Sequence, residues 1–192
     1  MKNLVHFLCF ALLSLVLGLG SAYYVIDQGF ALIAPNTGPW KTWINAGSLA
    51  ADPYTRARIA RFGDLPITSA SGLTFVATTD SEGRKLSSAC EYEIVARPLA
   101  AVWWSIALFD REGELIPNKA DRHAFNSQNL TVLPDGTQRI TLGPEARPGH
   151  WLPSGEDHDL TLVLRMIRPL SINQQRQGLG FQSLPAIQKG DC

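Results

Sequence analysis

The chain has 192 residues, in which 17 Lys and Arg balance 17 Asp and Glu, and 45% of the residues are hydrophobic. This length fits one domain with an appendage and excludes two full enzymatic halves. The balanced charge excludes the basic stripe that nucleic-acid binding requires, and the apolar content excludes a disordered chain. We therefore expect no nucleic-acid partner.

The first element is an apolar segment without charge, residues 4–26. A helix rises about 1.5 Å per residue, so one of this length spans the roughly 30 Å hydrocarbon core of a bilayer. Lys2 precedes the segment, Asp27 follows it, and Tyr23 and Tyr24 stand where an aromatic belt would meet the far interface. Positive charge at the start predicts that the remainder lies on the side of the membrane away from the cytoplasm.

Two other interpretations of this segment stay open. A signal peptide could be cleaved near Ala22, because Gly20-Ser21-Ala22 is a tolerable small-x-small site. The segment could also be a buried core helix, which its terminal position disfavours. We divide the chain into a membrane anchor or signal peptide at 1–26, a spacer at 27–39 and a folded domain at 40–192.

Three cysteines bear on the compartment. Cys9 lies inside the apolar segment, which leaves Cys90 and Cys192 as a pair in the remaining chain. In an oxidising space such a pair predicts a disulfide that ties the C-terminus to the segment around Cys90. Two unpaired thiols are the alternative.

The clearest start of a helix is Asp52-Pro53. Aspartate caps the free amides of a first turn, and proline at the first helical position loses no hydrogen bond. We expect a helix over 53–62 that ends at Gly63, a residue suited to a left-handed cap.

Short strands separated by turns follow this helix. Asp80 to Gly83 and Asp110 to Gly113 read as turns of one design, and Pro134-Asp135-Gly136 indicates a hairpin. The pattern predicts a mainly β domain, an antiparallel β-sandwich or jelly-roll-like fold with one short helix, behind an N-terminal transmembrane helix. The strands are expected at 73–79, 90–96, 102–109, 130–133, 139–142, 159–167 and 184–188.

Several spaced motifs resemble the bacterial family called domain of unknown function 1214. They are Asp52-Pro53-Tyr54-x-Arg56-Ala57 with Ala60, Trp104-Ser105-x-x-Leu108-Phe109-Asp110-x-x-Gly113, Ser127, Asp135-Gly136-Thr137, Gly149-His150-Trp151-Leu152-Pro153 and Leu162-x-Leu164-Arg165. The resemblance covers about residues 40–185 and implies a β-sandwich with no settled activity. Larger members carry a partner domain, number 1254, ahead of this one, so this chain looks like a short anchored form. His150 departs from the asparagine that members often have before Trp-Leu-Pro.

Catalytic and metal-binding groups form no recognised motif. The available hydroxyls and imidazoles belong to Ser105, Ser127, Ser154, His123, His150 and His158, and no serine lies in a Gly-x-Ser-x-Gly elbow. Residues 156–159 with His150 could supply metal ligands, but neighbours along a strand point to opposite faces, so an acidic turn is the simpler interpretation. We predict no metal and no cofactor, and leave the catalytic residues unknown.

Aromatic and cationic residues are the most suggestive set, since aromatic rings stack on sugars and headgroups while arginine holds carboxylates and phosphates. Those within the family-like motifs are our candidate ligand residues: Tyr54, Arg56, Trp104, Trp151 and Arg165. Core or scaffold roles are the alternative. We expect an uncharacterised module, anchored in a bacterial inner membrane and facing the periplasm, that binds a glycan, lipid headgroup or partner protein. A hydrolase or other small-molecule enzyme, and a purely structural role, remain alternatives.

Overall fold

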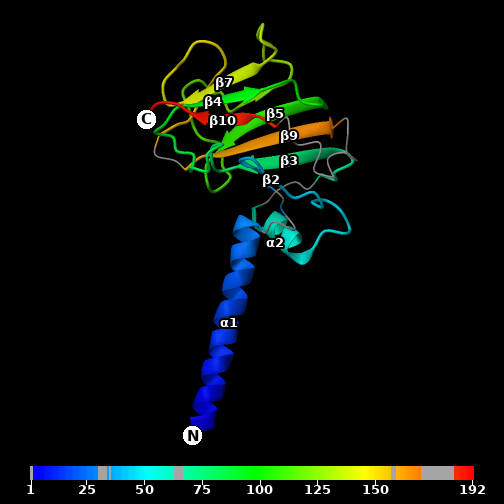
Figure 1. Ribbon diagram of the computed structural model, residues 1–192, viewed down its shortest axis with the longest axis vertical. Coiled ribbons are helices and arrows are strands. Elements are labelled where there is room, and N and C mark those ends of the chain that lie inside the picture. Colours follow the sequence, from blue (N-terminus) through cyan, green and yellow to red (C-terminus); the bar gives the residue numbers. More distant parts are fainter. Residues whose placement is uncertain (1, 30–33, 35, 63–66, 157–158, 170–183) are drawn as a thin grey trace.

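The protein is a β-sandwich at one end of a long helical rod, as the computed structural model shows (Figure 1). The structure describes residues 2–29, 34, 36–62, 67–156, 159–169 and 184–192. The rod is α1, Lys2–Gln28, and the second helix, α2, Pro53–Phe62, lies where the rod meets the sandwich. The mainly β fold predicted from the sequence is therefore confirmed.

Two sheets form the sandwich. A six-stranded sheet has the order β1-β2-β3-β9-β5-β6, and a four-stranded sheet has the order β10-β4-β7-β8. The strands are β1 (Asn36–Thr37), β2 (Trp40–Thr42), β3 (Gly72–Ala77), β4 (Tyr92–Ala96), β5 (Ala101–Phe109), β6 (Ala124–Asn126), β7 (Gln138–Gly143), β8 (Trp151–Pro153), β9 (Thr161–Pro169) and β10 (Ala186–Lys189).

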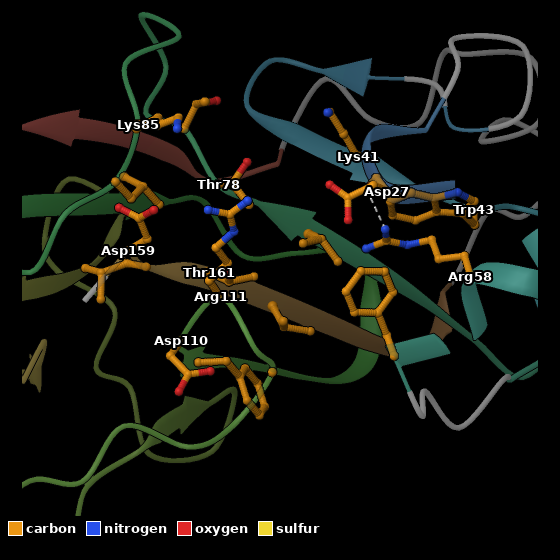
Figure 2. Close-up of a pocket in the computed structure, with 18 of the residues that line it drawn as sticks. Asp27, Lys41, Trp43, Arg58, Thr78, Lys85, Asp110, Arg111, Asp159 and Thr161 are labelled. Atoms are coloured by element: carbon orange, nitrogen blue, oxygen red, sulfur yellow. Dashed lines mark hydrogen bonds between the residues drawn. The ribbon is translucent and has the colours of Figure 1, made fainter. Parts of the chain in front are cut away.

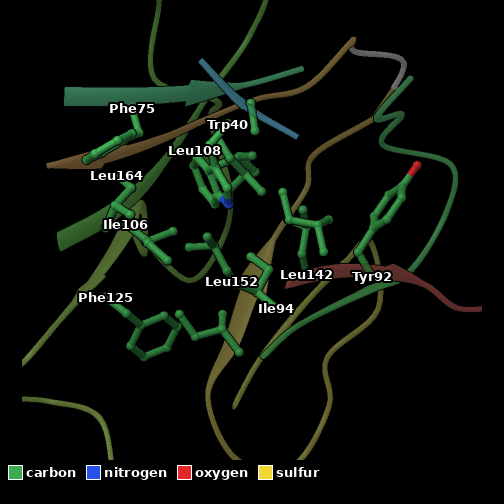
Figure 3. Packing of buried hydrophobic residues seen from close by; sticks show 14 of the residues in the cluster. Trp40, Phe75, Tyr92, Ile94, Ile106, Leu108, Phe125, Leu142, Leu152 and Leu164 are labelled. Atoms are coloured by element: carbon green, nitrogen blue, oxygen red, sulfur yellow. The ribbon is translucent and has the colours of Figure 1, made fainter. Parts of the chain in front are cut away.

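The core lies between the sheets because alternate side chains of each strand point inward. Leu164 of β9 packs with residues such as Ile94 of β4 and Leu142 of β7 (Figure 3). Leu162 of β9 belongs to the same cluster, and all four side chains are at most 1% exposed. Trp40 fills the same layer and donates from its indole nitrogen to the carbonyl of Pro185 at 2.7 Å. Among the described residues, this core cluster includes none from α1.

Two details of the sheets differ from the sequence-based expectation. β7 and β8 pair in parallel, so the four-stranded sheet is mixed. The turn at residues 134–136 exists, with the Leu133 amide bonded to the Thr137 carbonyl at 2.8 Å, but residues 130–133 form no strand. The predicted hairpin was wrong because β7 takes β4 and β8 as its partners.

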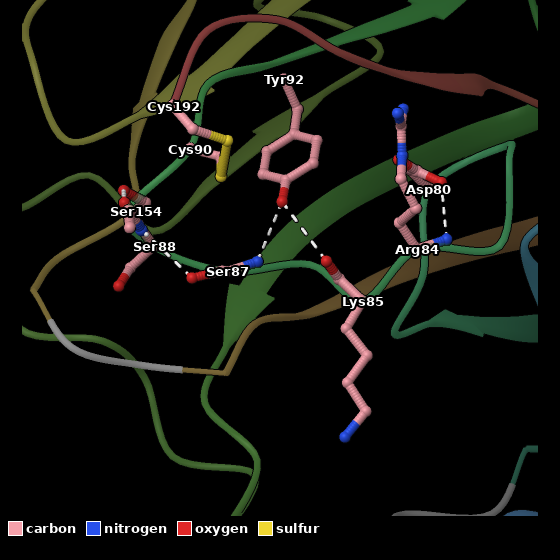
Figure 4. Close-up of a disulfide and its surroundings, with 10 residues drawn as sticks. Asp80, Arg84, Lys85, Ser87, Ser88, Cys90, Tyr92, Ser154 and Cys192 are labelled. Carbon is pink, nitrogen blue, oxygen red and sulfur yellow. Dashed lines mark hydrogen bonds and ion pairs between the residues drawn. A yellow bond between two sulfur atoms is a disulfide. The ribbon is translucent and has the colours of Figure 1, made fainter.

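The predicted disulfide between Cys90 and Cys192 is present (Figure 4). It links the residue two positions before β4 to the chain terminus that follows β10, and these two strands are already paired in antiparallel register. Nearby, the Tyr92 hydroxyl accepts a hydrogen bond from the Ser87 amide at 3.0 Å. The C-terminal strand is therefore held both covalently and by its backbone.

α1 is long and apolar enough to cross a membrane. Its apolar stretch has a mean hydropathy of 2.2, and none of that stretch is buried against the rest of the protein. A signal sequence has the same properties, so the helix is compatible with an anchor or with a leader. The disulfide is consistent with an oxidising compartment.

α2 begins as the sequence predicts. The Asp52 carboxylate accepts hydrogen bonds from the Tyr54 and Thr55 amides, both at 3.0 Å, and from the Thr55 hydroxyl at 2.6 Å. Burial on its own raises the pKa of Asp52, but these hydrogen bonds outweigh it and hold the pKa below its usual range. Gly63, the expected end cap, lies outside the described residues.

Candidate functional site

The outer face of the six-stranded sheet carries the candidate site. On β9, the residues between the core leucines point outward, namely Thr161, Val163 and Arg165. The adjacent strands add Val76 from β3 and Phe109 from β5, next to β9 in the pairing. A mixed apolar and polar surface therefore runs across the middle of the sheet.

A pocket of about 370 Å³ lies on this face (Figure 2). That volume falls within the roughly 300–1,000 Å³ of small-molecule sites. The lining comes from β2, β3, β5, β9, the connecting turns and both helices. It consists of Asp27, Lys41, Trp43, Arg58, Phe62, Val76, Thr78, Thr79, Lys85, Leu86, Phe109, Asp110, Arg111, Gly113, Asp159, Leu160, Thr161, Val163 and Arg165.

Arg58 of α2 holds the wall formed by the two helices. Its guanidinium donates to the carbonyls of Ile26 at 3.2 Å and Asp27 at 2.8 Å, the last turn of α1. The same guanidinium lies 4.0 Å from the Trp43 ring centroid and 4.4 Å from that of Phe62. Cations at a helix C-terminus and over aromatic rings are both stabilised, so this arginine fixes α1, α2 and Trp43 as one unit.

Cations outnumber carboxylates around the pocket. The lining has five Lys and Arg against three Asp, an excess of two positive charges. The cations are Lys41, Arg58, Lys85, Arg111 and Arg165, and the carboxylates are Asp27, Asp110 and Asp159.

Arg165 is the cation of this set that lies on β9. It is half-buried on β9, and its guanidinium lies 5.8 Å from the Phe109 ring centroid. Among the described residues, no hydrogen bond or ion pair engages its guanidinium. An arginine has five N–H donors in a planar fork that suits carboxylate and phosphate groups. The pocket therefore offers an anion its hydrogen-bond donors beside an apolar surface.

The five candidate ligand residues do not converge. Of these, Arg165 lines the pocket, whereas Tyr54 and Arg56 lie exposed on α2. Trp104 is 3% exposed and points into the core, which is the core role left open in the sequence analysis. Trp151 is half-buried and donates from its indole nitrogen to the Gly143 carbonyl at 3.0 Å, so it joins β8 to β7.

The serine and histidine candidates are not assembled for nucleophilic catalysis. The buried Ser154 hydroxyl donates to the Ser88 carbonyl at 3.0 Å, and the Ser127 hydroxyl accepts from the Trp104 amide at 3.5 Å. His123 contacts Asp121 at 3.3 Å, and His150 accepts from the Thr131 amide at 3.4 Å. Within the described ranges, no serine hydroxyl is hydrogen-bonded to a histidine ring.

The acidic segment considered for a metal falls partly outside the described residues, which exclude Asp157 and His158. In the part of the chain that the structure describes, no three His, Cys, Asp or Glu side chains gather as metal ligands.

Sequence reasoning missed most of the pocket lining, including Lys41, Arg58 and Phe62. Alternation along the strands carried part of the signal, because Leu162 and Leu164 point inward and so place Val163 and Arg165 on the outer face. The contribution of α1 and α2 to the same face had no such signal, since it depends on how the helices dock.

A match to a family model shows which protein family the chain belongs to. The model of the family described as "Protein of unknown function (DUF1214)" matches residues 71–171, more than half of the chain. The chain belongs to the DUF1214 family. The DUF1214 match begins next to β3 and ends after β9, so it includes the strands that form the floor of the pocket.

A solved structure supports the fold of this DUF1214 chain. The VPA0106 protein of Vibrio parahaemolyticus aligns with a TM-score of 0.59 and 16% identity over 74% of this chain and 36% of its own. An uncharacterised protein from Burkholderia cenocepacia aligns with a TM-score of 0.42 and 17% identity over 72% and 43%. The chain thus spans less than half the length of each of these two proteins. No curated protein matches it.

Proposed function

We propose that this DUF1214 protein is a binding module, anchored by α1 in a bacterial inner membrane with its sandwich in the periplasm. We further propose that the pocket takes an anionic envelope molecule with an apolar part, such as an acidic lipid headgroup and the start of its chains. The cations that surround the pocket support an anionic ligand. The apolar residues beside them, among them Val76, Val163 and Phe109, support a ligand that is more than an ion.

The half-buried Arg165 carries this proposal. Partial burial costs a guanidinium part of its hydration, and a native charge in that position normally has a partner. Arg139 on the opposite sheet has two carboxylate partners within 3.2 Å, whereas Arg165 has none among the described residues. A carboxylate or phosphate from outside the chain would supply the missing partner.

The place of the pocket supports the envelope as the source of the ligand. Asp27, which follows directly on the apolar part of α1, lines the pocket, and so do Arg58 and Phe62 of α2. If α1 spans the bilayer up to Ile26, the pocket lies at the depth of the headgroups. A lipid headgroup therefore needs only a short path into the site.

The test is a calorimetric titration, in which dihexanoyl phosphatidylglycerol is added to the full chain in a neutral detergent. Saturable binding is expected, and none with dihexanoyl phosphatidylcholine or with maltotriose as a neutral glycan. Arg165→Gln removes charge-assisted hydrogen bonds that are worth about 1.5–3 kcal/mol, so the affinity should fall roughly tenfold or more.

Arg139→Gln is the matched control, because it removes an outward-facing arginine from the other sheet. Its affinity should equal that of the unmodified chain. Equal affinities of the Arg165 and Arg139 variants, or binding of the neutral sugar in place of the anionic lipid, would contradict the proposal.

A further inference from the structure

α2 lies at the level where the apolar part of α1 ends. The Arg61 guanidinium donates to the Tyr23 hydroxyl at 3.0 Å and pairs with Asp27 at 3.4 Å. Arg58 reaches the carbonyls of Ile26 and Asp27, as described above. Tyrosine at the end of an apolar span marks the interface between hydrocarbon and headgroups. With α1 in a bilayer, α2 therefore lies among the headgroups, on the side of the sandwich that faces the rod (Figure 1).

The composition of α2 and of the segment before it suits that position. Residues 43–62 contain three arginines and a single acidic residue, Asp52, a net charge of 3 − 1 = +2. The Asp52 carboxylate is occupied as the cap of α2. Basic residues beside exposed apolar ones are typical of segments that lie on anionic membranes.

Two large side chains on this surface have little protein around them. Leu49 is 98% exposed and Tyr54 is 44% exposed. The exposed Arg56 guanidinium donates to the Leu49 carbonyl at 2.8 Å, which ties the segment carrying Leu49 to α2. A leucine held this far into the solvent costs hydration free energy that insertion into a bilayer would recover.

We infer that α2 and residues 48–52 form a second membrane contact, in which Leu49 and Tyr54 enter the interface and Arg56 binds the phosphates of an anionic leaflet. This contact holds the sandwich against the bilayer and turns the pocket toward the headgroups. The inference requires α1 to lie in a membrane and does not require the pocket to hold a ligand. It assigns Tyr54 and Arg56 to the lipid surface and Arg165 to the pocket.

The test places a fluorescent label at Leu49 in the full chain. Cys9→Ser removes the free thiol, the disulfide cysteines stay paired, and Leu49→Cys is labelled with a nitrobenzoxadiazole group. The protein is reconstituted into vesicles of phosphatidylcholine alone or mixed with phosphatidylglycerol. In the mixed vesicles we expect a blue-shifted emission, strong quenching by spin-labelled lipid and a several-fold loss of quenching by aqueous iodide.

Val132→Cys is the matched control, since Val132 is 50% exposed and lies between β6 and β7, away from α2 in the fold. Its label should stay in water in both kinds of vesicle. Arg56→Gln should return the Leu49 label toward the aqueous signal in mixed vesicles. Raised salt should act in the same direction, because screening weakens contacts between exposed charges.

Equal iodide quenching at positions 49 and 132 would overturn the inference. Equal insertion with and without phosphatidylglycerol would overturn the role assigned to Arg56. Arg165→Gln separates this inference from the proposed function, because it should weaken binding of the soluble short-chain lipid roughly tenfold or more and leave the Leu49 label in the membrane. Loss of both signals in that variant would count against two independent surfaces.

Discussion

Arginine side chains have different partners on the outer faces of the two sheets. On the four-stranded sheet, Arg139 of β7 pairs with Glu93 of β4 at 3.2 Å and with Asp135 at 3.0 Å. Beside this sheet, Arg147 of the β7–β8 connection pairs with Glu91, which directly precedes β4. On the six-stranded sheet, Arg165 has an aromatic neighbour and no carboxylate partner among the described residues. On the first face the arginine donors are already engaged by carboxylates of the same chain. On the second face the guanidinium donors of Arg165 remain available to a ligand. The difference teaches that a cation's neighbours, rather than its presence, mark the side of the sandwich suited to bind an anion.

The two sheets also differ in what holds them together. The four-stranded sheet consists of strands of three to six residues, and the Cys90–Cys192 disulfide links the segments that flank its strands β4 and β10. The six-stranded sheet is built on β5 and β9, each of nine residues, which pair along almost their full length. The four-stranded sheet therefore has a covalent link beside its strand pairing, whereas the six-stranded sheet has a long central ladder.

The largest expected effect comes from removing that link. The double substitution Cys90→Ser and Cys192→Ser removes a link between residues that are 102 positions apart in the sequence. In the chain-entropy model, this loss lowers the free energy of unfolding by up to about 4–5 kcal/mol. Denaturant titration of the full chain in detergent measures the loss. Cys9→Ser is the control and should change nothing. An unchanged midpoint on reduction of the disulfide would break the comparison between the sheets.

A slightly smaller loss is expected from Trp104→Ala on β5. The indole is 3% exposed in the core, so its removal leaves a cavity and should cost about 3–5 kcal/mol. Val102→Ala on the same strand is the control, because Val102 is 63% exposed and such surface changes stay within about 0.5 kcal/mol. Melting midpoints of both variants give the comparison. If Trp104→Ala melted like the unmodified protein, the indole would not be part of the core.

The smallest of these effects concerns Asp80, in the turn that leads from one sheet to the other. Its carboxylate accepts from the Arg84 guanidinium at 2.7 Å and from the Glu82 and Arg84 amides at 2.9 Å. Burial on its own raises the pKa of Asp80, but these hydrogen bonds and the Arg84 charge hold the pKa below its usual range. Asp80→Asn should therefore cost about 1–3 kcal/mol at neutral pH.

The pH dependence of this contribution has a definite sign. Because the pKa is lower in the folded state, the stability is complete above the unfolded value of about 3.9 and is lost as the pH falls through the folded value. Asp80→Asn should flatten stability against pH in that acidic range. Asp110→Asn is the control, since Asp110 occupies a turn of the same design, accepts from the Glu114 amide, and has no arginine four residues later. Identical acid profiles for the two variants would contradict the assignment to Asp80.

The sequence was informative wherever the signal is local. Asp52-Pro53 predicted the start of α2, and the expected strands at 102–109 and 159–167 correspond to β5 and β9. Residues 130–133 failed as a strand, because a turn signal cannot say which neighbour a strand will choose. The family motifs pointed to five ligand residues that the fold scatters over α2, the core, β8 and the pocket.

The amino-acid sequence by itself determined the apolar rod, the β-rich body and the two cysteines able to pair, because hydropathy, alternation and cysteine count are properties of the chain. Only the tertiary structure decided that the last turn of α1 and one face of α2 would meet the outer side of the six-stranded sheet. That meeting brings Arg58 to the carbonyls of α1 and makes a pocket over Arg165. The physical reason is that docking of distant elements depends on the shapes and charges of whole surfaces, which no short stretch of residues encodes alone.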